Sequence, residues 1–296
     1  MILYRMEGVE IPVTDSPLRY PGGKTQLKDF IFKLIHVNNI NKFTYVEPFA
    51  GGAGIAISLI LSGKAKKIII NDLDILIYNF WNAVINNTNE FIKKIKETPI
   101  NIEQWHKLKK IQQNPSDYSS FDVGFSTFFL NRTNRSGIIN GGPIGGYKQE
   151  GHYKLDCRFN KEKLINKILK IASLKDKIII TNYNALDFID NTIYYLKQES
   201  TFIFFDPPYF KQGKELYANF FTFKDHVYLR EKIKSLNKYY WIATYDLCKE
   251  ISEIYSSEKN SLINLNYSVN QKKKAKELLF YSDKIILPTK NKIANL

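Results

Sequence analysis

Short runs of β-branched and aromatic residues alternate along the chain with longer segments in which apolar residues recur at helical spacing. The first run, Thr44–Glu47, is followed by the apolar segment Ala53–Ser62. The second is followed by Ile77, Phe80 and Val84, whose i, i+3, i+7 spacing packs one face of a helix on a sheet. This alternation is typical of an α/β protein with a largely parallel sheet. The predicted strands are Thr44–Glu47, Lys67–Asn71, Lys177–Thr181, Thr201–Phe205, Tyr240–Thr244 and Leu262–Leu265, with a terminal hairpin formed by Leu278–Phe280 and Lys284–Leu287.

Residues 88–160 follow a different pattern. Polar helical stretches around Phe91–Lys96 and Ile102–Gln113 precede a glycine-rich segment, 137–151, that lacks the apolar periodicity of strand–helix units. Helical order returns at Asn160, an N-cap residue that Phe159 and Leu164 flank at the spacing of a hydrophobic staple. We therefore expect residues 88–160 to form a mainly helical insertion in a domain made of residues 14–87 and 161–296.

Composition places the chain among globular proteins, because 44% of its 296 residues are hydrophobic and 24% are charged. The longest apolar stretch, 55–61, is far shorter than the roughly 20 residues of a membrane helix, and the N-terminal residues lack the apolar region of a signal peptide. We expect a cytoplasmic protein. The two cysteines lack CxxC spacing and the four histidines are scattered, so the sequence predicts neither a disulfide framework nor a metal site.

A formal net charge of +14 favours polyanionic partners such as nucleic acid or an anionic membrane surface. Most of the cations are lysines, and the chain is also rich in asparagine and isoleucine, a bias that AT-rich coding alone produces. The charge therefore leaves nucleic acid as one of several partners until motifs are considered.

The segment Glu47–Gly54, Glu-Pro-Phe-Ala-Gly-Gly-Ala-Gly, lies where a predicted strand turns into a helix. Glycines there let the backbone approach a ligand closely, and a helix N-terminus favours negative charge. Asp72 ends the next strand, where a carboxylate in this architecture accepts hydrogen bonds from ribose hydroxyls. Because the glycines do not match the full dinucleotide spacing, a nucleoside cofactor without a pyrophosphate is the better interpretation.

The segment Asp206-Pro207-Pro208-Tyr209 directly follows the all-apolar strand Thr201–Phe205. A carboxylate at the carboxyl edge of a parallel sheet lies in the usual ligand crevice. The Asp206 carboxylate and the Pro207 carbonyl can each accept one N–H of an exocyclic amine, which makes the nitrogen more nucleophilic. Tyr209 offers a ring on which a base extruded from a duplex can stack.

These segments together resemble the Dam-like, class alpha, S-adenosylmethionine-dependent DNA adenine-N6 methyltransferases over most of the chain. The segment 17–24, which ends in Tyr-Pro-Gly-Gly-Lys, is similar to that family's N-terminal cofactor motif, and Asn184–Phe188 is similar to the segment beside the cofactor's adenine. The resemblance implies a Rossmann-like methyltransferase fold and S-adenosylmethionine as cofactor. The residues it implies at the cofactor are Tyr20, Lys24, Glu47, Pro48, Phe49, Gly51, Gly52, Gly54, Asp72, Asp187, Phe188 and Asp206.

The segment Phe128–Gly137 is similar to the family's Leu-Asn-Arg element, which opens the target-recognition domain, and it lies inside the insertion. Arginine pairs with guanine edges or clamps phosphates, and a glycine-rich hairpin can enter a groove of the duplex. The residues expected to contact DNA are Asn131, Arg132, Arg135, Tyr147, Lys148 and Arg158. A buried structural role for Arg132 is the alternative.

The expected reaction is therefore methylation of the N6 amine of adenine in a short duplex sequence, with the base flipped out. The sequence lacks the Pro-Cys pair required for methylating carbon 5 of cytosine. Cytosine-N4 in DNA and adenine in RNA are alternative substrates, and a non-catalytic DNA-binding scaffold is the alternative of another class. We expect a monomer that binds double-stranded DNA, with a companion restriction endonuclease as a further partner.

Overall fold

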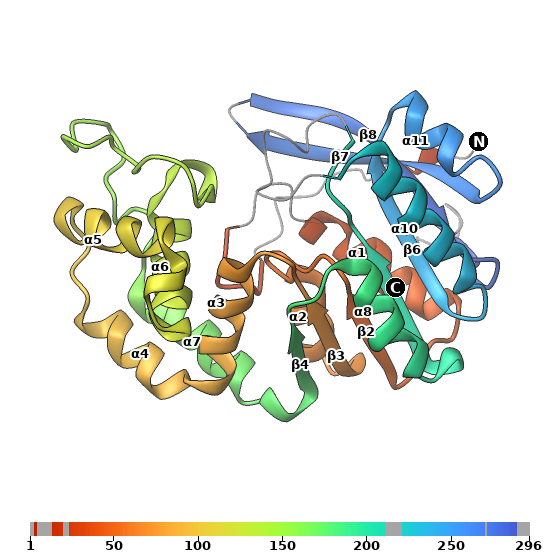
Figure 1. The fold of residues 1–296 in the computed structure, drawn as a ribbon, viewed down its shortest axis with the longest axis horizontal. Coiled ribbons are helices and arrows are strands. Elements are labelled where there is room, and N and C mark those ends of the chain that lie inside the picture. Colours follow the sequence, from red (N-terminus) through yellow and green to blue (C-terminus); the bar gives the residue numbers. More distant parts are fainter. Residues whose placement is uncertain (1–2, 5–13, 20–23, 211–220, 270, 289–296) are drawn as a thin grey trace.

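The computed structural model describes residues 3–4, 14–19, 24–210, 221–269 and 271–288. Within these residues one eight-stranded sheet runs in the order β1-β7-β8-β6-β5-β2-β3-β4 (Figure 1). Neighbouring strands from β6 to β4 pair in parallel, whereas β8 lies antiparallel between β6 and β7. The expected doubly wound, mostly parallel sheet is confirmed.

The bounds of the elements agree with most of the predicted ranges to within a few residues. The strands are β1 (Leu3–Tyr4), β2 (Phe43–Glu47), β3 (Ala65–Asn71), β4 (Ile178–Thr181), β5 (Thr201–Phe205), β6 (Tyr240–Asp246), β7 (Lys259–Val269) and β8 (Gln271–Tyr281). The helices are α1 (Lys28–Val37), α2 (Gly54–Leu61), α3 (Ile75–Asn86), α4 (Thr88–Glu97), α5 (Ile102–Gln113), α6 (Ser120–Thr133), α7 (Lys161–Ala172), α8 (Ala185–Asn191), α10 (Phe223–Ser235) and α11 (Lys249–Ile254). Short 3-10 turns are η1 (Lys24–Leu27), η2 (Pro115–Asp117), η3 (Arg135–Gly137), η4 (Lys175–Lys177), η5 (Ile193–Tyr195) and η6 (Gln198–Ser200).

Strand β5 shows why a continuous apolar run becomes a central strand. All five of its residues are buried, because helices cover both faces of the sheet. Successive side chains point to opposite faces. Phe202 and Phe204 therefore pack in one hydrophobic core with α1, α2, α3 and α7, while Ile203 and Phe205 pack in a second core with α8, α10 and α11. The molecule is a sheet between two helical layers.

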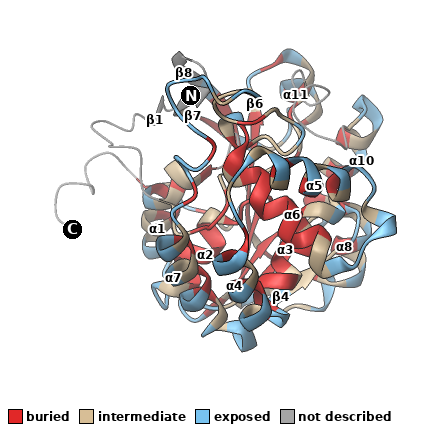
Figure 2. Cartoon of the chain, turned by 90° about the vertical axis from the view of Figure 1, so that its left-hand side faces the viewer, coloured by how far each residue is buried: buried red, intermediate tan, exposed pale blue. Residues whose placement is uncertain are grey.

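Residues 88–160, which we call the helical lobe, contain α4, α5 and α6 and contribute no strand to the sheet, although all of them are described (Figure 1). Their apolar residues continue the first core, and the rings of Phe80 on α3 and Phe128 on α6 stack with their centroids 6.0 Å apart. Figure 2 shows buried residues along α3 and α6. The division of the chain into a catalytic domain and an insertion at residues 88–160 remains a prediction.

Two features of the fold differ from the sequence predictions. The prediction that Leu278–Phe280 and Lys284–Leu287 form a hairpin is wrong. Strand β8 pairs with β7 on one side and with β6 on the other, and residues 282–288 form no strand. Helix α6 was not predicted, since buried residues occupy all of its faces and leave no amphipathic period.

Candidate active site

The strand order reverses between β2 and β5, which pair in parallel with Val46 opposite Ile203. The chain leaves β2 toward β3 and β4 on one side, and leaves β5 toward β6 on the other. A reversal of this kind opens a crevice at the carboxyl ends of the two strands, where doubly wound proteins bind ligands. The Glu47–Gly54 turn follows β2 and Asp206 follows β5, so both predicted motifs lie at the carboxyl ends of two adjacent strands.

Asp72, at the end of β3, braces the glycine turn. One carboxylate oxygen accepts the Gly51 backbone N–H at 2.7 Å, and the other accepts the Asp74 N–H at 2.9 Å. Gly51 and Ala53 both have positive φ values, 46°, which tighten the turn into α2. Burial raises the pKa of the Asp72 carboxyl to about 7.

Asn71 joins the ends of three strands through its side-chain amide. The Nδ2 group donates to the carbonyls of Pro48 (3.0 Å) and Tyr183 (2.9 Å). The Oδ1 atom accepts the Thr181 hydroxyl at 2.8 Å and the Tyr183 N–H at 2.9 Å. The loops that follow β2 and β4 are thereby held against the end of β3, beside Asp72.

Glu47 is a buried carboxyl at the end of β2. Its Oε1 atom accepts the Tyr45 hydroxyl at 3.0 Å and the Ala56 backbone N–H at 3.2 Å. Burial raises the pKa of Glu47 to about 8, and the two hydrogen bonds oppose that rise. A carboxyl held under these conditions gains a proton easily and ionises more readily when a cation approaches.

Asp206 lies where β5 ends, and two donors orient its carboxylate. The Thr244 hydroxyl of β6 donates to Oδ1 at 2.8 Å, and the Lys24 ammonium lies 2.8 Å from the same oxygen. The Lys24 side chain is only 3% exposed, so the ion pair is formed in a largely dry environment. Sequence reasoning assigned Lys24 to the cofactor by resemblance, and the structure places it against the catalytic motif.

Tyr209 is buried, and its hydroxyl lies between a cation and a carboxylate. Lys24 donates to the Tyr209 hydroxyl at 2.8 Å and also lies 4.8 Å from the centre of the ring. The hydroxyl in turn donates to Glu277, a β8 residue that is 2% exposed. Glu277 was not among the predicted site residues. The sign of it in the sequence is a lone acidic residue directly before the apolar run 278–280.

The other expected cofactor residues surround the same edge of the sheet. Pro48, Gly51 and Gly52 are buried in the turn, and the half-buried Phe49 ring lies edge-on to Phe221, with centroids 5.8 Å apart. A Cβ atom at Gly54 would lie 2.5 Å from the Thr25 hydroxyl, so a larger residue there requires the Thr25 side chain to move. Pro207 is buried and Pro208 is half-buried.

Two further residues of the predicted cofactor site lie at the start of α8. Asp187 is exposed, and the Asn184 amide that caps α8 donates to its carboxylate. Phe188 is fully buried in the second core. Tyr20 lies outside the described residues.

The candidate DNA interface is the loop 134–160 of the helical lobe. It exposes Arg135, Tyr147, Lys148 and Arg158, and the Tyr147 ring stacks on His106 of α5 with an interplanar angle of 12°. The expected DNA contact by Asn131 is wrong for this structure. Asn131 is fully buried, and its amide binds the backbone N–H and C=O of Arg19 at 2.7 and 3.0 Å and the Gly137 carbonyl at 2.9 Å.

Arg132 is half-buried and fixes the end of the same loop. Its Nε and Nη2 groups donate to the carbonyl of Arg158. Burial, together with the charges of Arg19 and Arg158, lowers the pKa of Arg132 to about 10. This geometry matches the alternative of a structural arginine more closely than that of a free phosphate clamp.

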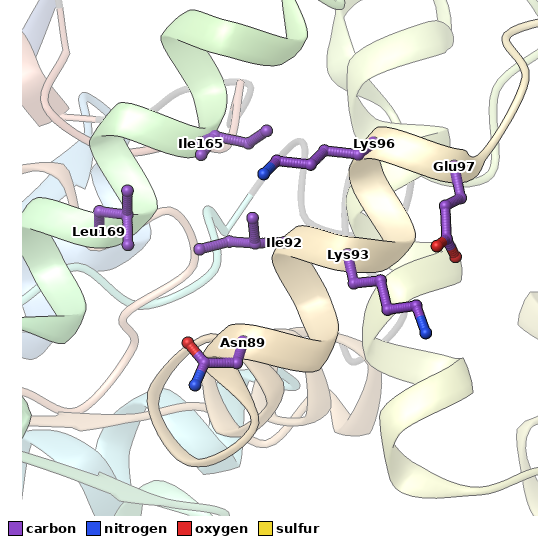
Figure 3. A pocket seen from close by; sticks show the side chains of 7 residues that line it. All are labelled: Asn89, Ile92, Lys93, Lys96, Glu97, Ile165 and Leu169. Atoms are coloured by element: carbon purple, nitrogen blue, oxygen red, sulfur yellow. The ribbon is translucent and has the colours of Figure 1, made fainter.

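An open groove of about 400 Å³ lies apart from this site, between α4 and α7. In Figure 3, Ile92 of α4 faces Ile165 and Leu169 of α7, while Lys96 extends across toward Ile165. The complete lining is Asn89, Ile92, Lys93, Lys96, Glu97, Ile165 and Leu169. These residues include none at the carboxyl ends of the strands, so the groove is not part of the candidate active site.

The described residues offer neither a metal cluster nor a membrane-spanning helix. Their His, Cys, Asp and Glu side chains form no group of three that could hold a metal ion. Among the same residues, no helix has both the length and the apolar character needed to cross a membrane.

Three comparisons show which known proteins the chain resembles. The family model for D12 class N6 adenine-specific DNA methyltransferases matches residues 20–271. The Type II methyltransferase M.MjaIII of Methanocaldococcus jannaschii is 26% identical over 209 residues, which are 65% of this chain and 68% of the relative. The rRNA methyltransferase aviRa of Streptomyces viridochromogenes aligns with a TM-score of 0.39 and 9% identity, over 89% of this chain and 86% of that one. That last likeness is too slight to support any conclusion.

Proposed function

Since the chain belongs to the family of D12 class N6 adenine-specific DNA methyltransferases, it methylates the N6 amine of adenine in DNA, and we propose that Asp206, Pro207 and Tyr209 carry the reaction. The observation that supports this assignment is that two motifs lie side by side at the carboxyl edge of the sheet. The Asp206 segment and the Glu47–Gly54 turn follow two adjacent parallel strands. The family match favours adenine in DNA over the three alternatives, which were cytosine-N4 in DNA, adenine in RNA and a non-catalytic DNA-binding scaffold.

Asp206 and Pro207 prepare the amine for attack. The Asp206 carboxylate accepts one N–H of the flipped adenine and the Pro207 carbonyl accepts the other, which raises electron density on the nitrogen lone pair. The Thr244 hydroxyl and the Lys24 ammonium hold Asp206 Oδ1 in a fixed orientation before the base arrives. A preoriented carboxylate needs no reorganisation in the transition state, and this lowers the barrier. Pro208 fixes the turn, and the Tyr209 ring stacks against the base.

We propose S-adenosylmethionine as the methyl donor, with the turn after β2 and Asp72 as its site. When bound, this cofactor supplies an electrophilic methyl group. The residues fit it in two respects. Asp72 offers carboxylate oxygens at the strand end, where ribose hydroxyls are bound in this architecture. Glu47 is a buried carboxyl whose pKa burial raises to about 8, and a cationic group bound beside it would favour its ionised form. Asp187 and Phe188 follow the next strand and complete the same edge.

We propose that the loop 134–160 reads the DNA sequence, with Arg135, Tyr147, Lys148 and Arg158 as contacts. Their exposure and the pinned base of the loop support this role, since a rigid loop positions side chains at base edges more accurately than a mobile one. A monomer acting in the cytoplasm, beside a companion restriction endonuclease, remains a prediction from the sequence.

The first test is modification-sensitive sequencing of DNA from a methylation-deficient host that expresses the wild-type chain or Asp206→Ala. We expect N6-methyladenine at one short sequence with the wild-type chain. For the variant we expect a loss of about 100-fold or more, because the acceptor that orients the amine is gone. DNA affinity should change little, since Asp206 contacts the reacting amine and not phosphates.

Asp190→Ala is the matched control. Asp190 forms an ion pair with Lys232 at 2.6 Å, outside the crevice, so this variant should methylate normally. Full methylation by Asp206→Ala would refute the proposed mechanism. A folded wild-type chain that leaves DNA unmodified would point to another substrate, with RNA as the next to test.

A further inference from the structure

Glu277 is a carboxylate in an apolar position of the sheet. It lies on β8 opposite Asp246 of β6 and Ile263 of β7, and it is followed by the buried residues Leu278 and Leu279. Glu277 is only 2% exposed. A carboxylate this deeply buried is strongly destabilising unless charged or hydrogen-bonding groups compensate for its lost hydration. The groups that compensate Glu277 therefore indicate what it is there to do.

Its partners belong to the active site and come from distant parts of the sequence. Glu277 Oε1 accepts the Tyr209 hydroxyl, and Oε2 lies 3.6 Å from the Lys24 ammonium. Lys24 also donates to the same tyrosine hydroxyl at 2.8 Å and pairs with Asp206 at 2.8 Å. One buried ammonium thus joins the two carboxylates and the tyrosine of the catalytic motif.

The direction of these hydrogen bonds determines how the tyrosine is held. Because Lys24 donates to the Tyr209 hydroxyl, the hydroxyl proton is left to point at Glu277, the acceptor on its other side. Fixing the tyrosine hydroxyl oxygen restricts χ1, which swings the ring. Because a phenol O–H prefers to lie in the plane of its ring, directing it at Glu277 also favours one rotation of the ring about χ2. Hydrogen bonds to ionised groups are the stronger ones, so the charge on Glu277 strengthens this restraint.

We propose that Glu277 is a positioning residue that holds the Tyr209 ring in the orientation in which it stacks on the flipped adenine. This inference rests on the proposed function of Tyr209. Glu277 acts through the tyrosine hydroxyl and does not touch the reacting atoms. The antiparallel strand β8 is then part of the active site, because it carries the acceptor that fixes the stacking ring.

The test compares Glu277→Ala, Glu277→Gln, Tyr209→Phe and the double variant Tyr209→Phe/Glu277→Ala in the full-length chain. Two duplexes carrying the recognised sequence are used. One has adenine at the target position and measures kcat and KM, and the other has 2-aminopurine there, which lacks the N6 amine and serves only as a fluorescent reporter of base stacking. We expect Glu277→Ala to lower kcat about tenfold or more with little change in the KM for DNA, since the lost bond orients the ring against the flipped base and does not contact the duplex. Glutamine keeps an oxygen that accepts the tyrosine hydroxyl, so Glu277→Gln should recover most of the activity.

The double variant distinguishes positioning from a general loss of structure. Once the hydroxyl is absent, removing Glu277 should lower kcat by less than twofold further, because the two groups act as a unit. The 2-aminopurine signal should show the same incomplete stacking in Glu277→Ala and in Tyr209→Phe. Glu258→Ala is the control, because Glu258 is a largely buried carboxylate paired with Arg230 at 3.0 Å away from Tyr209. It should change the thermal midpoint without changing kcat.

Three results would overturn the inference. They are wild-type kcat and fluorescence in Glu277→Ala, equal loss in the glutamine and alanine variants, and additive losses in the double variant. A wild-type chain that methylates no adenine would instead refute the proposed function. In that case the coupling between Tyr209 and Glu277 is still measured in thermal unfolding by the double-mutant cycle of wild type, Glu277→Ala, Tyr209→Phe and the double variant. Additive midpoint shifts would then refute the contact itself.

Discussion

In the proposed cofactor site, Asp72 accepts hydrogen bonds from ribose hydroxyls best when it is ionised, yet burial raises its pKa to about 7. Cofactor binding should therefore weaken as the pH falls through about 7, because the protonated carboxyl has lost an acceptor. We expect Asp72→Asn to lower cofactor affinity about tenfold at pH 8 and to flatten its pH dependence. Calorimetric titration with S-adenosylmethionine at pH 6, 7 and 8 measures both effects.

Glu47 also titrates in this range, with a pKa of about 8, but it is present in both proteins. The difference between the wild-type and Asp72→Asn curves therefore isolates Asp72. Asp190→Asn, a change outside the crevice, should reproduce the wild-type curve. Parallel curves for wild type and Asp72→Asn would contradict the assigned role of Asp72.

Residues carried by a local motif were predictable, whereas those recruited by long-range pairing were not. Asp206 and Asp72 follow apolar strands, and that placement alone puts them at the carboxyl edge of the sheet. Glu277 enters the site only because β8 pairs between β6 and β7, and the sequence does not encode that register in any short pattern. Asn131 belonged to a predicted motif, but burial gives it a structural role.

Helix packing at Gly124 joins the helical lobe to the rest of the molecule. A Cβ atom at Gly124 on α6 would lie 2.3 Å from the Asn79 carbonyl oxygen on α3, and backbone atoms cannot rotate away. We expect Gly124→Ala to lower the free energy of unfolding by about 3 kcal/mol, because the two helices must separate. Denaturant titration measures the change.

Gly142→Ala, a change of the same kind in the loop 134–160, is the control for Gly124→Ala. The nearest atom to a Cβ there is the Tyr147 hydroxyl at 4.0 Å, so the free energy of unfolding should change by no more than about 0.5 kcal/mol. Equal stability of the two variants would show that α3 and α6 do not pack as closely as the structure indicates.

The helices and strands that could be predicted are those with a clear periodicity of apolar residues and a typical length. The bounds of β5 and α5 agree with the predicted ranges, because a continuous apolar run and an amphipathic stretch are each distinctive. Helix α6 is buried on all sides and resembles neither pattern. The prediction of the terminal hairpin was wrong for another reason. Three lysines, 272–274, lie in the first half of β8, and a run of three charged residues is more typical of a turn than of an eleven-residue strand.

The net charge of +14 predicts that DNA binding weakens steeply with salt, because each phosphate contact releases condensed counterions. If the loop 134–160 meets the duplex, its exposed cations should account for part of that dependence. We expect the triple variant Arg135→Gln/Lys148→Gln/Arg158→Gln to reduce the slope of log affinity against log salt concentration by about 0.9 for each lost contact. Fluorescence anisotropy with a labelled duplex at several salt concentrations measures the slope.

The matched control removes the same number of positive charges at the amino ends of β3 and β4. Lys66 lies near the start of β3, and Lys175 and Lys177 lie in η4, just before β4; all three are exposed. Their joint replacement by glutamine should leave the slope unchanged, because counterions are released only where phosphates are contacted. Equal slopes for the two triple variants would mean that the loop does not form the interface, and that attraction to DNA comes from the charge of the whole molecule.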